Sequence, residues 1–349
     1  MRNKVIVGVF SGLVVLMLAL LLPNAINGIR YIGEVPVNTT ENTSQDGTGV
    51  EEVCEENKTI SIDGLWNQYM DYVKEQSEML FGTTNQSGSP EEQADTESKP
   101  EGMTVRVLDV GQGLSVLVQA DGETLLYDGG KEPDKVLGYL DGFGVKQLDY
   151  VICSHYDADH CGGLVGVLEE FPVGLVLEPD TTHDSATYEA LMEAERGITV
   201  TYPAVGDTYT LGAGSFTIIS PVSYDYSDSN NLSVGIRIAY GDTAVFITGD
   251  AELESELDLI EYADTQGIPL TSNLLVAGHH GSNTSNSSML LDAVKPSMAA
   301  ISVGKDNTYG HPGEDALNRL RERQIEVYRT DEQGTLTFYS DGTVLGLSG

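Results

Sequence analysis

Basic residues are scarce in this chain of 349 residues. Lys and Arg together number 18 against 54 Asp and Glu, which gives a formal net charge of −36. The excess of acidic residues is not confined to one stretch of the sequence. A surface this acidic repels a long polyanion, and nucleic-acid-binding proteins usually show the opposite balance. The composition therefore argues against nucleic acid as a partner, unless a local basic patch compensates.

Cysteine is rare as well, and three cysteines do not make a disulfide framework. Cys54 stands alone, whereas Cys153 and Cys161 flank a histidine-rich motif. We expect the latter two to be small buried thiols, with a bridge between them as the alternative. Glycine, in contrast, is abundant with 39 residues, which indicates many tight turns.

Only one long apolar run is present, from Val5 to Leu22, and it follows Arg2 and Lys4. About 18 apolar residues suffice to cross a bilayer, and basic residues before them place the N-terminus inside the cell. We interpret residues 1–33 as an uncleaved signal anchor, with a cleaved signal peptide as the alternative. This predicts localisation on the extracellular face of a bacterial cell membrane, or secretion after cleavage.

Residues 34–102 are rich in Thr, Asn, Ser, Gln and Glu and show little sustained periodicity. This composition is typical of a disordered acidic linker. Within it, Ile60–Phe81 has the apolar spacing of a short amphipathic helix, which would either dock on a partner surface or act as a solvated spacer. Residues 103–349 form the folded domain in this interpretation, because that stretch is long enough to bury its own core.

From residue 103 on, short apolar runs alternate with Gly, Asp and Asn. The predicted strands are Thr104–Val110, Ser115–Gln119, Thr124–Tyr127, Tyr150–Cys153, Leu175–Leu177, Ser215–Ile219, Ser233–Tyr240, Ala244–Thr248, Asn273–Val276, Met298–Val303 and Thr335–Tyr339. The predicted helices are Asp134–Leu140, Gly163–Glu170, Ala186–Glu195, Glu252–Tyr262, Ser288–Val294 and Glu314–Arg323. Strands interleaved with outer helices fit a layered sandwich built on two central sheets.

One motif carries four ligand-type side chains in six positions: His155, Asp157, Asp159 and His160. It follows an apolar strand and precedes a predicted helix that Gly163 opens, so we expect it in a strand-to-helix loop. Such a loop can turn its side chains toward one point, and two imidazoles with two carboxylates suit a pair of divalent cations. A loop that merely caps the helix is the alternative, although a cap needs no histidine.

Further ligand-type residues stand in loops. Asp250 directly follows a predicted strand, where its carboxylate would bridge two metals or only cap the next helix. His279 and His280 follow another strand, and adjacent side chains point differently, so one would ligate while the other meets substrate. His311 precedes a predicted helix and is either a ligand or a helix-entry residue. His183 lacks ligand-type spacing, so we expect it in an exposed loop.

Seven motifs of this chain resemble, in their order, those of ComEC-type metallo-β-lactamase-like domains: Asp109-Val110-Gly111-Gln112-Gly113, Tyr127-Asp128-Gly129-Gly130, Ser154-His155-Tyr156-Asp157-Ala158-Asp159-His160-Cys161-Gly162-Gly163, Asn230-Asn231-Leu232-Ser233, Thr248-Gly249-Asp250, His279-His280-Gly281-Ser282 and Tyr309-Gly310-His311-Pro312. The resemblance covers nearly all of residues 103–349. Such domains are the extracellular hydrolase domains of bacterial DNA-uptake channels, and stand-alone relatives exist. The resemblance implies an α/β fold, the four-layer αββα metallo-β-lactamase sandwich, with metals at the edge of its two sheets.

Two departures bear on function. Asp157 stands where the wider superfamily has His, which resembles the ComEC-type variant and argues against a β-lactamase. Leu114 stands where that subfamily usually has Asp, so the supporting role of the Asp is lost or reassigned. The chain also has a single apolar segment, so a role as a DNA channel does not carry over with the fold.

These residues predict metal-assisted hydrolysis of a phosphoester by water that two cations activate. The predicted ligands are His155, Asp157, Asp159, His160, Asp250, His280 and His311. Asp250 would lie between the cations and Asp159 would take part in the chemistry, with His279 as the proton donor to the leaving alkoxide. The cations would be Zn²⁺ or Mn²⁺, because a carboxylate at position 157 hardens the site.

The predicted function is therefore that of an extracellular, membrane-anchored, metal-dependent phosphodiesterase. Its substrate would be a phosphoester of the cell wall or of nucleic acid, and no protein partner is evident. An extracellular DNA nuclease is the alternative that the family resemblance favours. A metal-binding surface module without turnover is the alternative of another class.

Overall fold

The computed structural model describes residues 102–348. The predicted anchor, the predicted linker up to residue 101, the helix predicted over Ile60–Phe81 and Cys54 lie outside the described residues. Within 102–348, no helix combines the length and the apolar character that crossing a membrane requires.

The first sheet consists of β1 (Met103–Val107), β2 (Val116–Ala120), β3 (Glu123–Tyr127), β4 (Leu148–Ile152), β5 (Val173–Leu177), β6 (Val200–Thr201), β14 (Leu336–Ser340) and β15 (Leu345–Leu347). Their order across the sheet is β15-β14-β1-β2-β3-β4-β5-β6. The strands from β3 to β6 run parallel to one another, whereas the remaining pairs are antiparallel.

The second sheet consists of β7 (Thr208–Leu211), β8 (Gly214–Ser220), β9 (Gly235–Tyr240), β10 (Thr243–Ile247), β11 (Leu274–Val276), β12 (Met298–Ile301) and β13 (Glu326–Arg329). Their order is β13-β12-β11-β10-β9-β8-β7, and the strands from β10 to β13 are parallel. β10 and β11 are buried throughout, as expected for parallel strands that are covered on both faces.

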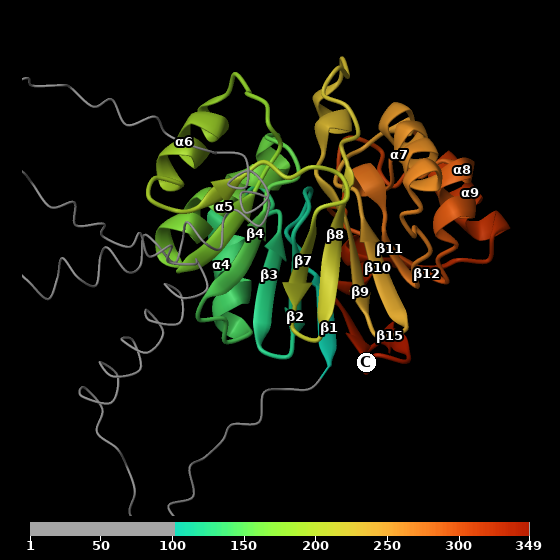
Figure 1. Ribbon diagram of the computed structural model, residues 1–349, viewed down its shortest axis with the longest axis horizontal. Coiled ribbons are helices and arrows are strands. Elements are labelled where there is room, and N and C mark those ends of the chain that lie inside the picture. The colour runs from blue at the N-terminus through green and yellow to red at the C-terminus, as the bar shows by residue number, and fades with distance from the viewer. Residues whose placement is uncertain (1–101, 349) are drawn as a thin grey trace, which may run out of the picture. The chain divides into compact units, whose positions relative to one another are not determined.

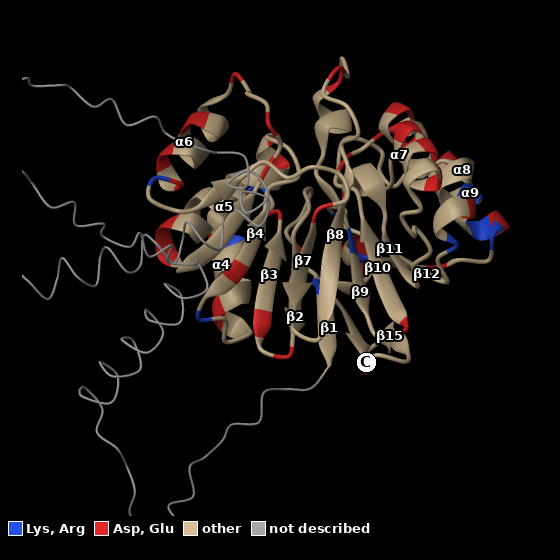
Figure 2. Cartoon of the chain, in the orientation of Figure 1, with Lys and Arg blue, Asp and Glu red and all other residues tan. Residues whose placement is uncertain are grey.

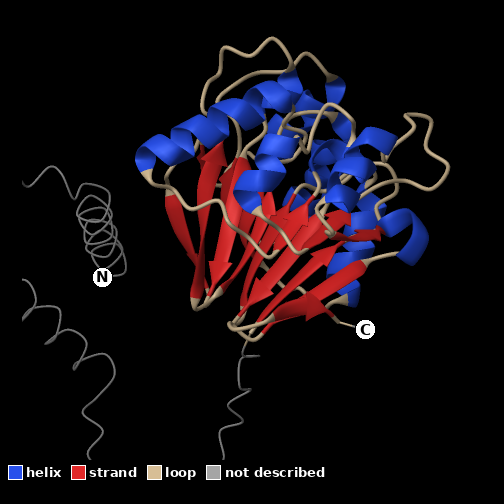
Figure 3. Cartoon of the chain, turned by 90° about the vertical axis from the view of Figure 1, so that its right-hand side faces the viewer, coloured by secondary structure: helices blue, strands red, loops and turns tan. Residues whose placement is uncertain are grey.

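The helices are α4 (Pro133–Gly142), α5 (Ala158–Glu170), α6 (Ala186–Ala194), α7 (Leu253–Gln266), α8 (Ser288–Val294), α9 (Glu314–Glu322) and α10 (Thr330–Gln333), with short 3₁₀ turns η1 (Ser229–Leu232) and η2 (Gly278–Gly281). Helices α4 to α6 cover the outer face of the first sheet, and α7 to α9 cover that of the second (Figure 1). Figure 3 shows the two sheets facing each other with helices outside them.

The main core lies between the two sheets. Apolar side chains of both sheets, among them Val105, Phe216, Val245 and Phe338, form one buried cluster there. The Tyr127 hydroxyl crosses this layer and donates to the Val234 carbonyl at 2.7 Å. Two further clusters pack each set of helices on its sheet. The four layers confirm the predicted αββα sandwich.

Most predicted elements are present with small shifts of their ends, but two predictions were wrong. Helix α5 begins at Ala158 rather than at Gly163, so part of the metal motif is helical and not in a loop. In addition, four strands were not predicted, namely β6, β7, β13 and β15. These four strands are the outermost strands of the two sheets. They are short and mostly half-buried or exposed, so they lack the apolar run by which central strands are recognised.

Candidate metal centre

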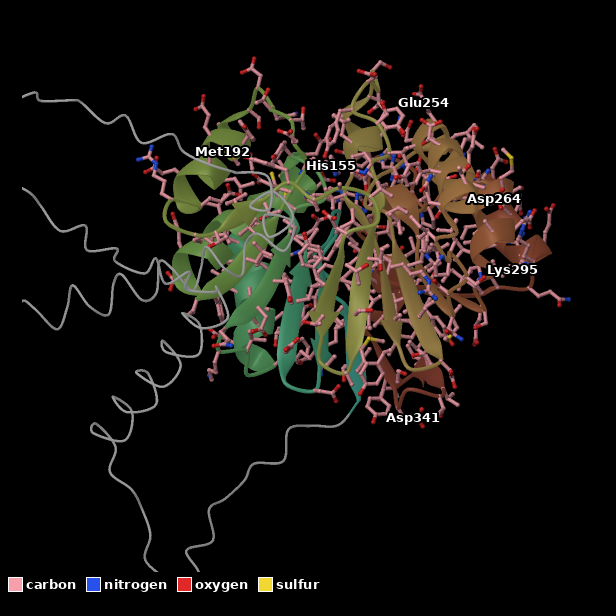
Figure 4. All side chains as sticks on the ribbon, viewed as in Figure 1. His155, Met192, Glu254, Asp264, Lys295 and Asp341 are labelled. Carbon is pink, nitrogen blue, oxygen red and sulfur yellow. The ribbon has the colours of Figure 1, made fainter. Side chains whose placement is uncertain are left out.

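The predicted site residues gather at one edge of the sandwich, where parallel strands of both sheets end. His155 follows β4 in the first sheet, and Asp250 and His280 follow β10 and β11 in the second. Since carboxyl ends of parallel strands meet at one sheet edge, residues far apart in the sequence become neighbours there. Figure 4 shows His155 at this edge, between the two sets of helices.

The first turn of α5 presents two of these residues. Asp159 and His160 are helical, and the helix start is pressed against the loop that follows β3. The Gly129 N–H donates to the His160 carbonyl, and the Gly163 N–H donates to the Gly130 carbonyl, both at 2.8 Å. A side chain on Gly163 would meet the Gly129 backbone, so only glycine permits this approach. The close approach directs the His160 ring toward the strand ends.

Two groups of ligand atoms converge closely enough to hold a metal ion. His155, His160 and Asp250 form one group, and Asp159, His160 and His280 form the other. Within each group all ligand atoms lie within 4.8 Å of one another. Asp250 faces both groups, because its Oδ1 is 3.1 Å from His160 Nε2 and its Oδ2 is 3.6 Å from His280 Nε2. Nitrogen and carboxylate ligands in this number suit Zn²⁺ or a harder divalent cation.

Several of these ligand atoms are buried without a hydrogen-bond partner. Within the described residues this holds for Nε2 of His155, His160 and His280 and for Oδ1 of Asp250. Buried polar atoms are nearly always satisfied, so a cluster of unsatisfied atoms at one point calls for a missing partner. A divalent cation fits, because every one of these atoms can offer it a lone pair.

In two of these rings, those of His160 and His280, the other nitrogen, Nδ1, makes a polar contact within the protein. Their Nε2 atoms are therefore the ones that can bind a metal. His280 Nδ1 lies 3.0 Å from the Ser302 carbonyl oxygen, and a carbonyl only accepts, so the proton is on Nδ1. His160 Nδ1 lies 2.8 Å from Asp128 Oδ2 in the same way. Such contacts orient a ligating imidazole and fix its tautomer. Asp128 was not predicted as a site residue, although its place directly after a predicted strand is a signal in the sequence.

His279 has a different environment from its neighbour. Its Nδ1 lies 3.1 Å from Glu252 Oε1, and its Nε2 lies 3.7 Å from Asp250 Oδ2. The ring is therefore held beside the ligand groups without belonging to either. Glu252 was not predicted as a site residue; it was only the first residue of a predicted helix.

The remaining histidines and Asp157 lie around this centre. Asp157 is in neither ligand group; its carboxylate is 3.8 Å from His155 Nε2 and 3.6 Å from His183 Nε2. We expected His183 in an exposed loop. It is half-buried, and its Nε2 contacts Asp157 at the rim of the site. The His311 ring lies 5.4 Å from that of His279, and its Nδ1 is buried without a partner within residues 102–348. Asp157 and His311 stay predictions as ligands.

Electrostatics of the site couple the carboxylates to the imidazoles. Burial opposes ionisation of Asp250, but the nearby imidazoles of His160 and His280 outweigh it and hold the pKa of Asp250 well below its usual value. Burial likewise opposes ionisation of Asp159, yet His280 and His160 lower its pKa to about 2. Burial and the neighbouring His160 lower the pKa of His155 to about 4. These carboxylates are therefore ionised and His155 is neutral at neutral pH, which are the forms that bind a metal. Burial opposes protonation of His160, but Asp250 and Asp128 outweigh it and raise the pKa of His160 well above its usual value, so this ring would release a proton when a metal binds.

Leu114 and the two cysteines have structural places. The Leu114 side chain is buried in the core between the sheets, and its N–H donates to the Asp159 carbonyl at 3.1 Å. A backbone group thus supports the metal motif at the position where the subfamily usually has Asp. Cys153 and Cys161 are free and buried, in agreement with the predicted thiols.

Comparison with known proteins agrees with this geometry. Residues 108–305 match the Metallo-beta-lactamase superfamily. Competence protein ComA of Neisseria gonorrhoeae is 34% identical over 237 residues, which cover 67% of this chain and 32% of that protein. ComE operon protein 3 of Bacillus subtilis (strain 168) is 30% identical over 256 residues, again with 67% and 32% covered. The chain thus spans about a third of the length of these relatives.

Among solved structures, CmlA, a diiron β-hydroxylase from Streptomyces venezuelae, is similar with a TM-score of 0.49 at 15% identity, covering 68% of this chain and 54% of that one. The match to the family spans more than half of the chain. It includes β4, α5, β10 and β11, and with them all residues of the two ligand groups. The chain belongs to the metallo-β-lactamase superfamily and is related to competence proteins of the ComEC type.

Proposed function

We propose that this chain is a phosphodiesterase that uses two divalent cations, Zn²⁺ or Mn²⁺. The observation that carries the proposal is the convergence of buried imidazole and carboxylate atoms from both sheets, several of which have no partner within the described residues. Bound cations would supply Lewis acidity toward phosphoryl oxygens and would lower the pKa of water toward neutrality. They would be held by His155, His160, His280, Asp159 and Asp250, with Asp157 and His311 as further ligands.

His279 is suited to move a proton. Its Nδ1 lies 3.1 Å from the Glu252 carboxylate, which holds the ring in one orientation. Its Nε2 then faces the Asp250 carboxylate, beside the ligand groups. In this position His279 would donate a proton to the alkoxide that leaves phosphorus. Glu252 would act as the positioning residue for His279.

The substrate is better matched by a small phosphodiester than by a long nucleic acid. Figure 2 shows Asp and Glu spread over the helices and upper loops, whereas Lys and Arg are fewer and scattered, with the largest group near α9. Two arginines there are already engaged: Arg319 donates to backbone carbonyls, and Arg323 pairs with Asp292 at 2.7 Å. A duplex would therefore meet carboxylates on much of the described surface, at a cost in affinity.

A DNA nuclease is the second candidate, because one relative is named a competence protein. The two candidates differ in their response to salt. A nuclease should bind DNA measurably at low salt, with affinity that falls steeply as salt is added. Absence of DNA binding at low salt, together with turnover of small diesters, would remove the nuclease.

The deciding experiment is turnover of bis-(p-nitrophenyl) phosphate by the full chain loaded with Zn²⁺ or Mn²⁺, combined with metal analysis. Asp250→Ala should abolish turnover and reduce the metal content. The matched control is Asp264→Ala, an exposed carboxylate further along α7 (Figure 4). Bound metal without turnover under either cation would support a metal-binding surface module instead.

The location of the enzyme belongs to the same proposal. The apolar run Val5–Leu22 after Arg2 and Lys4 would anchor the chain in a bacterial membrane with the hydrolase domain outside the cell. Protease treatment of intact cells tests this, because an extracellular domain is digested and a cytoplasmic one is protected.

A further inference from the structure

Beside the metal centre lies an open cavity of about 570 Å³ that the proposed mechanism does not use. Its walls come from η1 and the two residues before it, from the start of α7 and the residue before it, from the segment 283–288 and from α9. Segments that are distant in the sequence thus build one recess, which is large enough for a small organic group.

The cavity is connected to the metal centre through one carboxylate. Glu252 lines the cavity, and its Oε1 accepts both from His279 Nδ1 at 3.1 Å and from the Thr284 hydroxyl at 2.7 Å. Thr284 lines the cavity too. A group bound in this recess therefore lies on the side of the centre where the proton donor is held.

The charge of the lining is negative. Asp228, Glu252 and Glu254 contribute carboxylates, and Arg319 contributes the single guanidinium among the lining residues. Arg319 is largely committed, because its Nε donates to the Asn286 carbonyl at 2.8 Å and its Nη2 to the Ser285 carbonyl at 2.6 Å. A polyanion is repelled by such a lining, whereas a cation is attracted.

Asn231 adds an unused hydrogen-bond donor. Its side chain lines the cavity but is only 3% exposed, and its Oδ1 accepts from the Glu252 N–H at 2.9 Å. Its Nδ2 makes no hydrogen bond within residues 102–348 and is not among the fully buried unpaired atoms, so solvent reaches this donor. An oxygen of a bound group would satisfy this donor.

We propose that the cavity is the subsite for one ester arm of the phosphodiester, and that it selects a small amino-alcohol arm. The ammonium group would be bound by Asp228 and Glu254, and an oxygen of the arm by the Asn231 amide. The inference rests on the proposed phosphodiesterase function and names its substrate class. It also explains how an acidic protein can recognise a phosphodiester: attraction comes from the arm and not from a chain of phosphates.

Two diesters that share a p-nitrophenyl leaving group test the proposal, namely 2-aminoethyl and ethyl p-nitrophenyl phosphate. They differ by one ammonium group. Two exposed carboxylates that attract the ammonium group should raise kcat/KM for the aminoethyl diester by roughly two- to thirtyfold over the ethyl diester. Equal kcat/KM for the two diesters in the wild type would overturn the proposal.

Variants show whether the preference arises in the cavity. Asp228→Asn and Glu254→Gln should each lower kcat/KM for the aminoethyl diester by about two- to fivefold and leave the ethyl diester unchanged. Asp264→Asn removes an exposed carboxylate on the same helix outside the cavity and should change neither (Figure 4). A preference that survives both cavity substitutions would place the ammonium group elsewhere and refute the assignment.

A binding measurement separates this proposal from the proposed activity. Saturation-transfer NMR with 2-aminoethyl p-nitrophenyl phosphate on the metal-free chain should show contact that the double variant Asp228→Asn/Glu254→Gln loses. If the chain turns over no diester but binding depends on the two carboxylates, the activity is wrong and the cavity assignment stands. If diesters are hydrolysed but no such binding or preference is found, the cavity assignment falls alone.

Discussion

Replacing Asp128 by Asn tests whether the tautomer of His160 controls metal binding. Asp128 is fully buried, and its Oδ1 accepts from the Ser154 N–H at 2.7 Å. Its Oδ2 accepts both from the Ser154 hydroxyl at 2.7 Å and from His160 Nδ1 at 2.8 Å. An amide keeps the shape but places an N–H where Oδ2 accepts. His160 must then carry its proton on Nε2, and its free lone pair points away from the metal site.

The magnitude follows from these contacts. The bond from the Ser154 N–H survives, and the Ser154 hydroxyl can turn to accept from the new amide, so only part of the network is lost. We expect the unfolding free energy of the metal-free chain to fall by about 1–3 kcal/mol. Metal affinity should fall by about 10- to 100-fold, the usual effect of losing a residue that orients a ligating imidazole. This corresponds to about 1.4–2.7 kcal/mol of binding free energy.

Competition for Zn²⁺ with a chromophoric chelator measures the affinity, and urea unfolding measures the stability. Asp149→Asn is the matched control. Asp149 accepts from the Thr124 N–H at 2.8 Å, and it lies near the start of β4, whereas the metal motif follows the end of that strand. It should lose some stability and no affinity. A folded Asp128→Asn chain with the Zn²⁺ affinity of the wild type would refute the reasoning.

Three further predictions concern proton transfer, packing and pH. His279→Gln should lower kcat by about 10²- to 10⁴-fold with the metal content unchanged, because it removes a proton donor and not a ligand. Gly163→Ala should lower the unfolding free energy by about 1–3 kcal/mol, since its methyl group would meet backbone. Gly138→Ala, in open space on α4, should raise it by about 0.5–1 kcal/mol. Burial and a neighbouring carboxylate raise the pKa of Glu195 from 4.5 to about 9. The native state thus keeps a proton that the unfolded chain has lost, so the stability of the wild type should fall as pH rises through this window, and Glu195→Gln should flatten that fall.

Each of these expectations has a result that contradicts it. Loss of bound metal in His279→Gln would make that residue a ligand. Equal stability of Gly163→Ala and wild type in urea would show that the loop after β3 can move away. Parallel curves of unfolding free energy against pH for Glu195→Gln and the wild type would place the titrating group elsewhere.

The central elements could be predicted because their residues are buried, and burial requires runs of apolar residues that are visible in the sequence. Helix α8 was predicted with the bounds it has, and the strands that end at the site were found from their apolar runs. The edge strands were not predicted, because one side of each is open to solvent and their composition resembles that of loops. The start of α5 was misplaced for another reason: Gly162 and Gly163 were read as opening a helix, whereas they lie inside it and permit close contact with the loop after β3.

The ligand types could be predicted from the sequence, but the contacts that orient them could not. Asp128 contacts His160, and Ser302 contacts His280, each from the end of another strand. The spacing of residues in the sequence does not predict such contacts. Glu252 is similar, since its role depends on the turn that brings His279 beside it. These contacts are properties of the folded chain, in which strands distant in the sequence end at the same edge.

The turn that carries His279 and His280 shows most clearly how the fold produces the site. Both residues have left-handed backbone, with φ of 50° and 54°, a conformation that costs roughly 1–3 kcal/mol for a residue other than glycine. Asn286 stabilises the turn, because it accepts from the Gly278 N–H and donates to the Gly278 carbonyl, both at 2.9 Å. The tight turn sets the two rings at 75° to each other. One imidazole can therefore join the ligand group while the next is held by Glu252, so the strained backbone separates the proposed metal ligand from the proposed proton donor at adjacent positions.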